Sequence, residues 1–191
     1  DTDQLISEIM ENINKAVELN NNDFEAHRML AEVHLSLHEF DKAYDHGFKS
    51  FQLNPNDPRV TSVFGEILIR IDKLDKGVEL LEKAYELDPI PQGQNTSDRR
   101  LCALLTGYYL KNDFNKCKDL INDISDIDFK SWLLSTNIHK KNNFNIDNLN
   151  WFLSGSKKFA NIDIELEIDR FHLNNKELSK TLETEAKEIL N

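Results

Sequence analysis

The sequence contains few of the residues that interrupt regular structure: among 191 residues there are only 6 glycines and 4 prolines. With 39% apolar and 30% charged residues, this composition excludes a collagen-like or intrinsically disordered chain and is typical of a compact domain or a repeat array. No apolar run approaches the roughly 18 residues that a membrane-spanning helix needs, and residues 1–4 are not the basic start of a signal peptide. We therefore expect no membrane anchor and no signal peptide. Because residue 1 is not Met, the chain is compatible with being part of a longer protein that has an upstream domain.

Cysteine and positive charge are also scarce. Cys102 and Cys117 form no CxxC pair and are too few for a secreted disulfide scaffold, so we expect free thiols and a cytoplasmic protein. The 23 basic residues are outnumbered by 34 acidic ones, which gives a net charge of −11. This charge disfavours attraction to nucleic acid or to an anionic membrane surface, so neither is an expected partner.

Enzyme motifs are absent from the sequence as well. It has no glycine-rich phosphate loop, no nucleophile elbow and no cysteine cluster with metal-binding spacing. The best candidate for a metal site is His27, His34 and His38, which share one helical face. Packing explains the positions of His27 and His34 better, and Leu35 stands where a protease-type motif has Glu. We therefore predict no catalytic residue, no metal and no cofactor, and a protein that is not an enzyme.

What the sequence does contain is a repeat of 34 residues. The segment Leu-Asn-Pro-Asn-Asp at 53–57 recurs as Leu-Asp-Pro-Ile-Pro at 87–91, and Leu-Asn-Asn-Asn-Asp at 19–23 is an earlier echo at the same spacing. This register defines a half repeat at 4–23 and complete repeats at 24–57 and 58–91.

Each complete repeat has the pattern of two helices joined by a tight turn. Apolar residues recur at helical spacing. The turns are expected at His38, Asp72 and Asn112, because His, Asp and Asn tolerate the left-handed conformation better than most residues other than Gly. Pro55 and Pro89 follow the second helices, where proline ends a helix. Small residues stand where paired helices must approach closely, namely Ala31, Ala43, Ser50, Gly65, Gly77 and Ala84.

The repeat pattern weakens beyond residue 91. After an insertion at 92–97 we expect a third repeat at 98–131 and a degenerate fourth pair at about 129–158. Apolar residues that indicate the second helix of the fourth pair are Ile146, Leu149, Trp151, Phe152 and Leu153.

The C-terminal segment, 161–191, differs from the repeats. Residues 162–173 alternate apolar and acidic side chains, which suits a strand, but a lone strand has no partner in a helical array. With Asn161 as the N-cap, a short helix is the interpretation that we prefer. Residues 175–190 have one apolar stripe and predict an amphipathic helix, which we expect to cap the end of the array.

These patterns resemble the tetratricopeptide repeat (TPR) family, whose 34-residue signature has small residues at repeat positions 8, 20 and 27 and Pro at 32. The sequence departs from the signature at His27 and Thr61, which replace Trp at position 4, and at Gly47, which replaces an aromatic residue at position 24. The resemblance implies an all-α fold, a right-handed superhelix of stacked antiparallel helix pairs over residues 1–160 with a C-terminal capping helix in 161–191.

The resemblance also implies which side chains line the concave groove, those at repeat positions 2, 5, 9, 12 and 13. We call them the groove positions: Glu25, Arg28, Glu32, Leu35, Ser36, Arg59, Ser62, Glu66, Ile69, Arg70, Arg99, Cys102, Thr106, Tyr109, Leu110, Lys130, Leu133, Asn137, Lys140 and Lys141. Seven are basic and three acidic, which favours an acidic or carboxylate-bearing partner segment, with Ile69 and Tyr109 as apolar anchors. The alternative is that Arg28 with Glu32, and Glu66 with Arg70, are i,i+4 pairs within their own helices.

TPR arrays are used for protein–protein interaction, so we expect a scaffold that binds another protein or peptide. The candidate partner-binding residues are Arg28, Glu32, Arg59, Glu66, Ile69, Arg70, Arg99, Cys102, Thr106, Tyr109 and Lys130. Residues 16–19 and 26–28, the proline-containing loop after residues 87–89 and the degenerate tail also look like the TPR arrays attached to bacterial class III adenylate and guanylate cyclases. That resemblance implies a regulatory role beside an upstream catalytic domain. A self-association module that forms homo-oligomers without a peptide ligand is the alternative.

Overall fold

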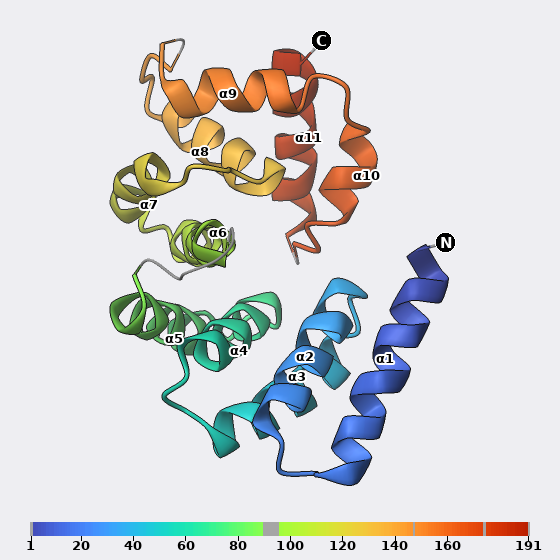
Figure 1. The fold of residues 1–191 in the computed structure, drawn as a ribbon. Helices are drawn as coiled ribbons and strands as arrows, with labels where there is room; N and C mark the ends of the chain where they lie inside the picture. The colour runs from blue at the N-terminus through green and yellow to red at the C-terminus, as the bar shows by residue number, and fades with distance from the viewer. Residues whose placement is uncertain (1, 90–95, 147, 174, 191) are drawn as a thin grey trace. The chain divides into compact units, whose positions relative to one another are not determined.

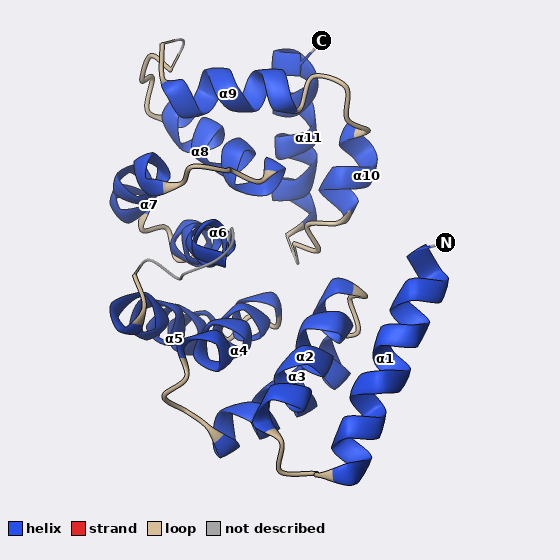
Figure 2. Ribbon diagram, viewed as in Figure 1, coloured by secondary structure: helices blue, strands red, loops and turns tan. Residues whose placement is uncertain are grey.

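The computed structural model describes residues 2–89, 96–146, 148–173 and 175–190. Within these ranges the chain is built from α-helices and one short 3-10 helix, without strands (Figures 1 and 2). The expected all-α fold is therefore confirmed. Among these helices, none combines the length and apolar character needed to cross a bilayer. The chain divides into two compact units, residues 1–90 and 91–191.

The first unit is made of consecutive helices that pack in pairs. Helix α2 pairs with α3, α4 pairs with α5, α3 packs on α4, and α1 packs on α2. Each pair lies within one of the repeats that the 34-residue spacing predicts. The bounds are α1 (Thr2–Leu19), α2 (Phe24–Ser36), α3 (Phe40–Leu53), α4 (Pro58–Arg70) and α5 (Leu74–Leu87).

Aspartates at the repeat boundaries start the first helix of each pair. The Asp23 carboxylate accepts hydrogen bonds at 3.0 and 3.2 Å from the backbone N–H groups two and three residues later, which caps α2. Asp57 caps α4 in the same way, at 2.8 and 3.4 Å. Pro58 then occupies the first turn of α4, where a missing N–H costs nothing.

The turns inside the pairs have the predicted left-handed backbone. The φ angles are 60° at His38, 63° at Asp72 and 61° at Asn112, which confirms the three expected turn residues. His38 and Asp72 are 34 residues apart, and Asp72 and Asn112 are 40 apart, as a six-residue insertion requires. Most of that insertion, residues 92–95, lies outside the described residues. Asn143 and His172, with φ of 54° and 45°, adopt the same conformation at turns that the pattern did not predict.

Small residues let the helices of the first unit approach closely, as predicted. Ala43 and Ala84 are fully buried. A Cβ atom placed on Gly77 of α5 would lie 2.9 Å from the carbonyl oxygen of Gly65 and 3.0 Å from the backbone nitrogen of Ile69, both on α4. The two helices therefore touch through their backbones, and only glycine allows so close an approach at this position.

In the second unit most helices pack on α8, which carries the buried Trp132. Helix α6 packs on α7 and α8, α8 packs on α9 and α11, and α10 packs on α11. The fully buried Trp132 indole stacks on Phe152, with ring centroids 5.8 Å apart, and its Nε1 donates to the Phe152 carbonyl at 3.2 Å. The bounds are α6 (Thr96–Leu110), α7 (Phe114–Leu120), the 3-10 helix η1 (Ile121–Asp123), α8 (Phe129–Lys141), α9 (Asn150–Lys158), α10 (Ile164–Asp169) and α11 (Lys176–Leu190).

Two details of the second unit differ from expectation. Ile146 and Leu149 precede α9, which begins only at residue 150. The short helix expected in 162–173 is α10, but its N-cap is Asp163 instead of Asn161, because Asp163 directly precedes the helix and accepts from the Leu166 N–H at 3.1 Å.

Candidate functional site at the groove positions

At the groove positions of α2, Arg28 is held between two carboxylates. Its guanidinium donates to Glu25 at 2.7 and 3.0 Å and to Glu32 at 2.7 Å. These hydrogen bonds, first of all those with Glu25, raise the pKa of Arg28, and the bond from Arg28 lowers the pKa of Glu25. The Arg28 side chain is only 13% exposed. It is a charge fixed within its own helix, as the alternative i,i+4 interpretation predicts for Arg28 and Glu32.

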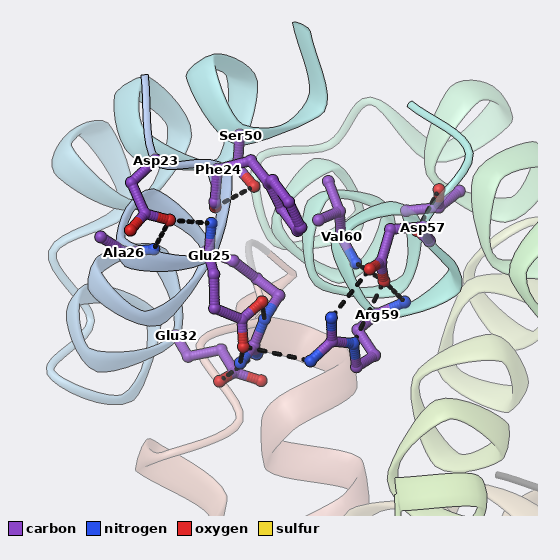
Figure 3. Close-up of polar contacts among 11 residues, drawn as sticks. Asp23, Phe24, Glu25, Ala26, Glu32, Ser50, Asp57, Arg59 and Val60 are labelled. Atoms are coloured by element: carbon purple, nitrogen blue, oxygen red, sulfur yellow. Dashed lines mark hydrogen bonds and ion pairs between the residues drawn. The ribbon is translucent and has the colours of Figure 1, made fainter. Parts of the chain in front are cut away.

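Arg59 joins two neighbouring repeats. Its Nη1 donates to Glu25 of α2 at 3.1 Å, while Nη2 and Nε donate to Asp57 at 2.8 and 3.2 Å. Figure 3 shows Arg59 reaching from α4 toward Glu25. The side chain is 48% exposed, so the guanidinium still presents an edge to solvent. Of the arginines at the groove positions of the first unit, Arg59 is the most exposed.

The end of α4 is less open than the pattern suggests. Arg70 Nη2 lies 4.0 Å from the Glu66 carboxylate, the second of the expected i,i+4 pairs. Ile69 is buried, and its Cγ1 would lie only 2.8 Å from a Cβ atom placed on Gly77 of α5. Ile69 therefore does not offer the exposed apolar anchor that the sequence predicts, because it faces the second helix of its own pair.

The groove positions of the second unit are more deeply buried. Arg99 is exposed, but Cys102, Thr106, Tyr109 and Lys130 are buried. The cause is packing: α8 covers α6, and α11 in turn covers α8. Burial raises the pKa of the Cys102 thiol to about 12, so the thiol is protonated at neutral pH. Tyr109 is likewise not the exposed anchor that the sequence predicts.

Helix α11 makes polar contacts with groove positions of α8, besides the ion pair of its Lys187 with Glu165 of α10 at 2.7 Å. Asn137 Nδ2 donates to both carboxylate oxygens of Glu185, at 2.9 and 3.0 Å. The Tyr109 hydroxyl donates to Asn137 Oδ1 at 2.6 Å, and Lys140 Nζ lies 3.6 Å from Glu188. Sequence reasoning identified the helix but missed Glu185 and Glu188, since an apolar stripe gives the buried face of a helix and not the surface that it meets.

Charge is distributed unequally over the groove positions. In the first unit three arginines face three glutamates, and these side chains bind one another. In the second unit the groove positions hold four basic residues and no acidic one, namely Arg99, Lys130, Lys140 and Lys141. The whole positive excess at the groove positions therefore belongs to the second unit.

A cluster of three histidines lies between α2 and α3. His27 Nδ1 is 2.9 Å from His46 Nδ1, and the His34 ring stacks on His46 with centroids 5.6 Å apart. His34 Nδ1 also lies 2.6 Å from a Glu39 carboxylate oxygen. The sequence grouped His27 and His34 with His38, which lies in the turn, and missed His46. In the part of the chain that the structure describes, no group of such side chains is arranged to hold a metal ion.

No protein-family model and no curated protein matches the sequence. Solved structures do. MamA superposes with a TM-score of 0.61 at 13% identity, over 84% of this chain and 94% of MamA. YrrB, described as a TPR protein with an unusual peptide-binding site, gives 0.57 at 13% identity, over 98% of this chain and 86% of YrrB.

A third similar structure is PilF from Pseudomonas aeruginosa, with a TM-score of 0.58 at 14% identity over 78% of this chain. The chain spans 65% of PilF. These comparisons lend no support to an association with a nucleotide cyclase. At such identities the likeness concerns the fold alone, and the chain has the helix-pair fold of solved TPR structures.

Proposed function

We propose that this chain is a protein–protein interaction module whose groove positions bind an acidic segment of a partner protein. The observation that carries the proposal is the excess of four basic residues at the groove positions of the second unit, on a chain with a net charge of −11. Acidic surfaces elsewhere repel an acidic partner, so pairing is favourable only beside the exposed basic residues among these four, Arg99, Lys140 and Lys141. The TPR-like fold supports the interaction role.

Each unit contributes one exposed arginine to such binding. Arg59 of the first unit is 48% exposed but already pairs with Asp57 and Glu25, so a partner carboxylate competes with these internal carboxylates. Arg99 of the second unit is exposed as well. We therefore expect charge reversal at either arginine to weaken binding.

A phage-displayed peptide library, selected on the full chain, tests the proposal. We expect acidic peptides whose affinity falls as salt rises from about 50 to about 500 mM. Arg99→Glu and Arg59→Glu are each expected to weaken binding, while Lys76→Glu, the same charge change on the exposed side of α5, leaves it unchanged. Selection of peptides without acidic residues, or equal affinity of all three variants, contradicts the proposal.

The remaining expectations stay predictions. Self-association is tested by size-exclusion chromatography with light scattering. A dimer that does not bind the acidic peptides favours this alternative. The attachment to a nucleotide cyclase is tested by the gene region upstream of residue 1. The absence of enzymatic activity and a cytoplasmic location are likewise predictions.

A further inference from the structure

A chain of buried polar groups ends on a carboxylate at the junction of α6, α8 and α11. The Tyr109 hydroxyl donates to Asn137 Oδ1 at 2.6 Å, and Asn137 Nδ2 donates to the two oxygens of Glu185 at 2.9 and 3.0 Å. Tyr109 is 5% exposed and Asn137 is fully buried. Because such groups are costly to bury without partners, this arrangement needs an acceptor at the position of Glu185.

The chemistry of the site selects a carboxylate. An ionised carboxylate only accepts hydrogen bonds, so it must face the amide nitrogen of Asn137, while the amide oxygen accepts the hydrogen bond from the Tyr109 hydroxyl. Lys140, 3.6 Å from Glu188, adds a positive charge at the edge of the same contact. The two glutamates are three residues apart on one helix and therefore lie on one face. The site thus fits an acidic amphipathic helix.

Helix α11 is held in this site by a small apolar surface. Two of its 15 residues, Leu182 and Ala186, are buried, whereas α5 buries five residues of 14. Apolar burial is the main source of helix docking energy, so α11 is among the elements expected to open at low cost.

We propose that Tyr109, Asn137 and Lys140 form a carboxylate-reading site for an acidic helix, and that α11 is its internal occupant, which a partner helix of the same pattern displaces. This deepens the proposed function and rests on it: the partner segment is a helix in which a Leu is followed three residues later by Glu and four residues later by a small apolar residue, as in Leu182, Glu185 and Ala186. The occupant also neutralises part of the positive excess of the second unit.

The test uses the full chain and a fluorescently labelled peptide of residues 175–190, followed by anisotropy. A tethered helix competes at a high effective concentration, so the wild-type chain binds the peptide weakly. Glu185→Ala weakens the internal occupant, and we expect this chain to bind the peptide at least about tenfold more tightly, the factor that one hydrogen bond to a charged group contributes. Glu177→Ala removes an exposed carboxylate from the same helix and serves as the matched control, with wild-type affinity expected.

Variants of the peptide test the same contact without changing the folded chain. Against the Glu185→Ala chain, a peptide that itself carries Glu185→Ala is expected to lose about tenfold in affinity, and a peptide with Glu177→Ala none. Hydrogen exchange on the wild-type chain gives a measurement without any substitution: amides of α11 exchange at least about tenfold faster than those of α8 if α11 opens separately.

Three results overturn the inference. These are equal peptide affinity for all chains, peptide affinity that does not depend on Glu185, and exchange of α11 as slow as that of α8. Failure here leaves the proposed function testable, because the effects of Arg59→Glu and Arg99→Glu on selected acidic peptides do not involve α11. Failure of those reversals with success of the labelled peptide instead confines recognition to the Asn137 site.

Discussion

Gly77→Ala tests the close approach of α4 and α5. The new Cβ would lie 2.8 Å from Ile69 Cγ1, 2.9 Å from the Gly65 carbonyl oxygen and 3.0 Å from the Ile69 nitrogen. Two of these three atoms belong to the backbone, so α4 has to move as a whole. Overpacking of this kind costs about 1 to 3 kcal/mol, here toward the upper end, and the better helix propensity of Ala returns about 1 kcal/mol.

The net expectation is a loss of about 1 to 2 kcal/mol in the free energy of unfolding. Urea denaturation followed by far-ultraviolet circular dichroism should then show a midpoint lower by about 0.5 to 1 M. The control is Lys76→Ala, an exposed neighbour on the same helix, for which a change below about 0.5 kcal/mol is expected. Both tryptophans, Trp132 and Trp151, belong to the second unit, so their fluorescence shows whether the second unit unfolds together with the first.

A midpoint that stays the same or rises in Gly77→Ala would refute this reasoning. It would mean that α4 and α5 do not touch through their backbones and that Gly77 is present for another reason. The gain in helix propensity from Gly to Ala would then exceed any cost of overpacking.

Three further substitutions test other parts of the structure. Ala84→Arg places a charge in a fully buried contact and should lower the stability by about 3 kcal/mol or more; a wild-type thermal melt would contradict the predicted repeat register. Tyr109→Phe leaves the buried Asn137 oxygen without its 2.6 Å donor and should cost about 1 to 3 kcal/mol, read from urea titrations by tryptophan fluorescence. Burial and the neighbouring charges of His27 and His34 lower the pKa of His46 below 6.5, so the unfolded state binds more protons and stability falls as the pH drops below that value. His46→Gln should flatten this pH dependence, and an unchanged profile would refute it.

Local features of the fold were predictable because they depend on residues close in sequence. His38, Asp72 and Asn112 were placed in left-handed turns from the repeat register and from the conformational tolerance of these residue types, and the φ angles agree. The close contact at Gly65 and Gly77 followed from small residues at fixed repeat positions.

Exposure at the candidate site could not be predicted in the same way. Periodicity identifies the face of a helix, but not what covers it: Ile69 turns toward α5, and Tyr109 bonds to Asn137 of α8. His46 of α3 contacts His27 of α2, and the spacing of residues within one helix cannot predict a contact between two helices. Glu185 was missed for the same reason, because its partner stands 48 residues earlier in the chain.

Mapping an acidic peptide on the chain by NMR tests the central claim most directly. A peptide selected on the full chain is titrated into isotope-labelled protein, and the backbone amide shifts are followed. Binding at the groove positions predicts that the perturbed amides gather on the first helices, α2, α4, α6 and α8, and that Arg99→Glu reduces the shifts while Lys76→Glu does not. Shifts confined to the second helices, α3, α5, α7 and α9, would contradict a function that depends on the groove positions.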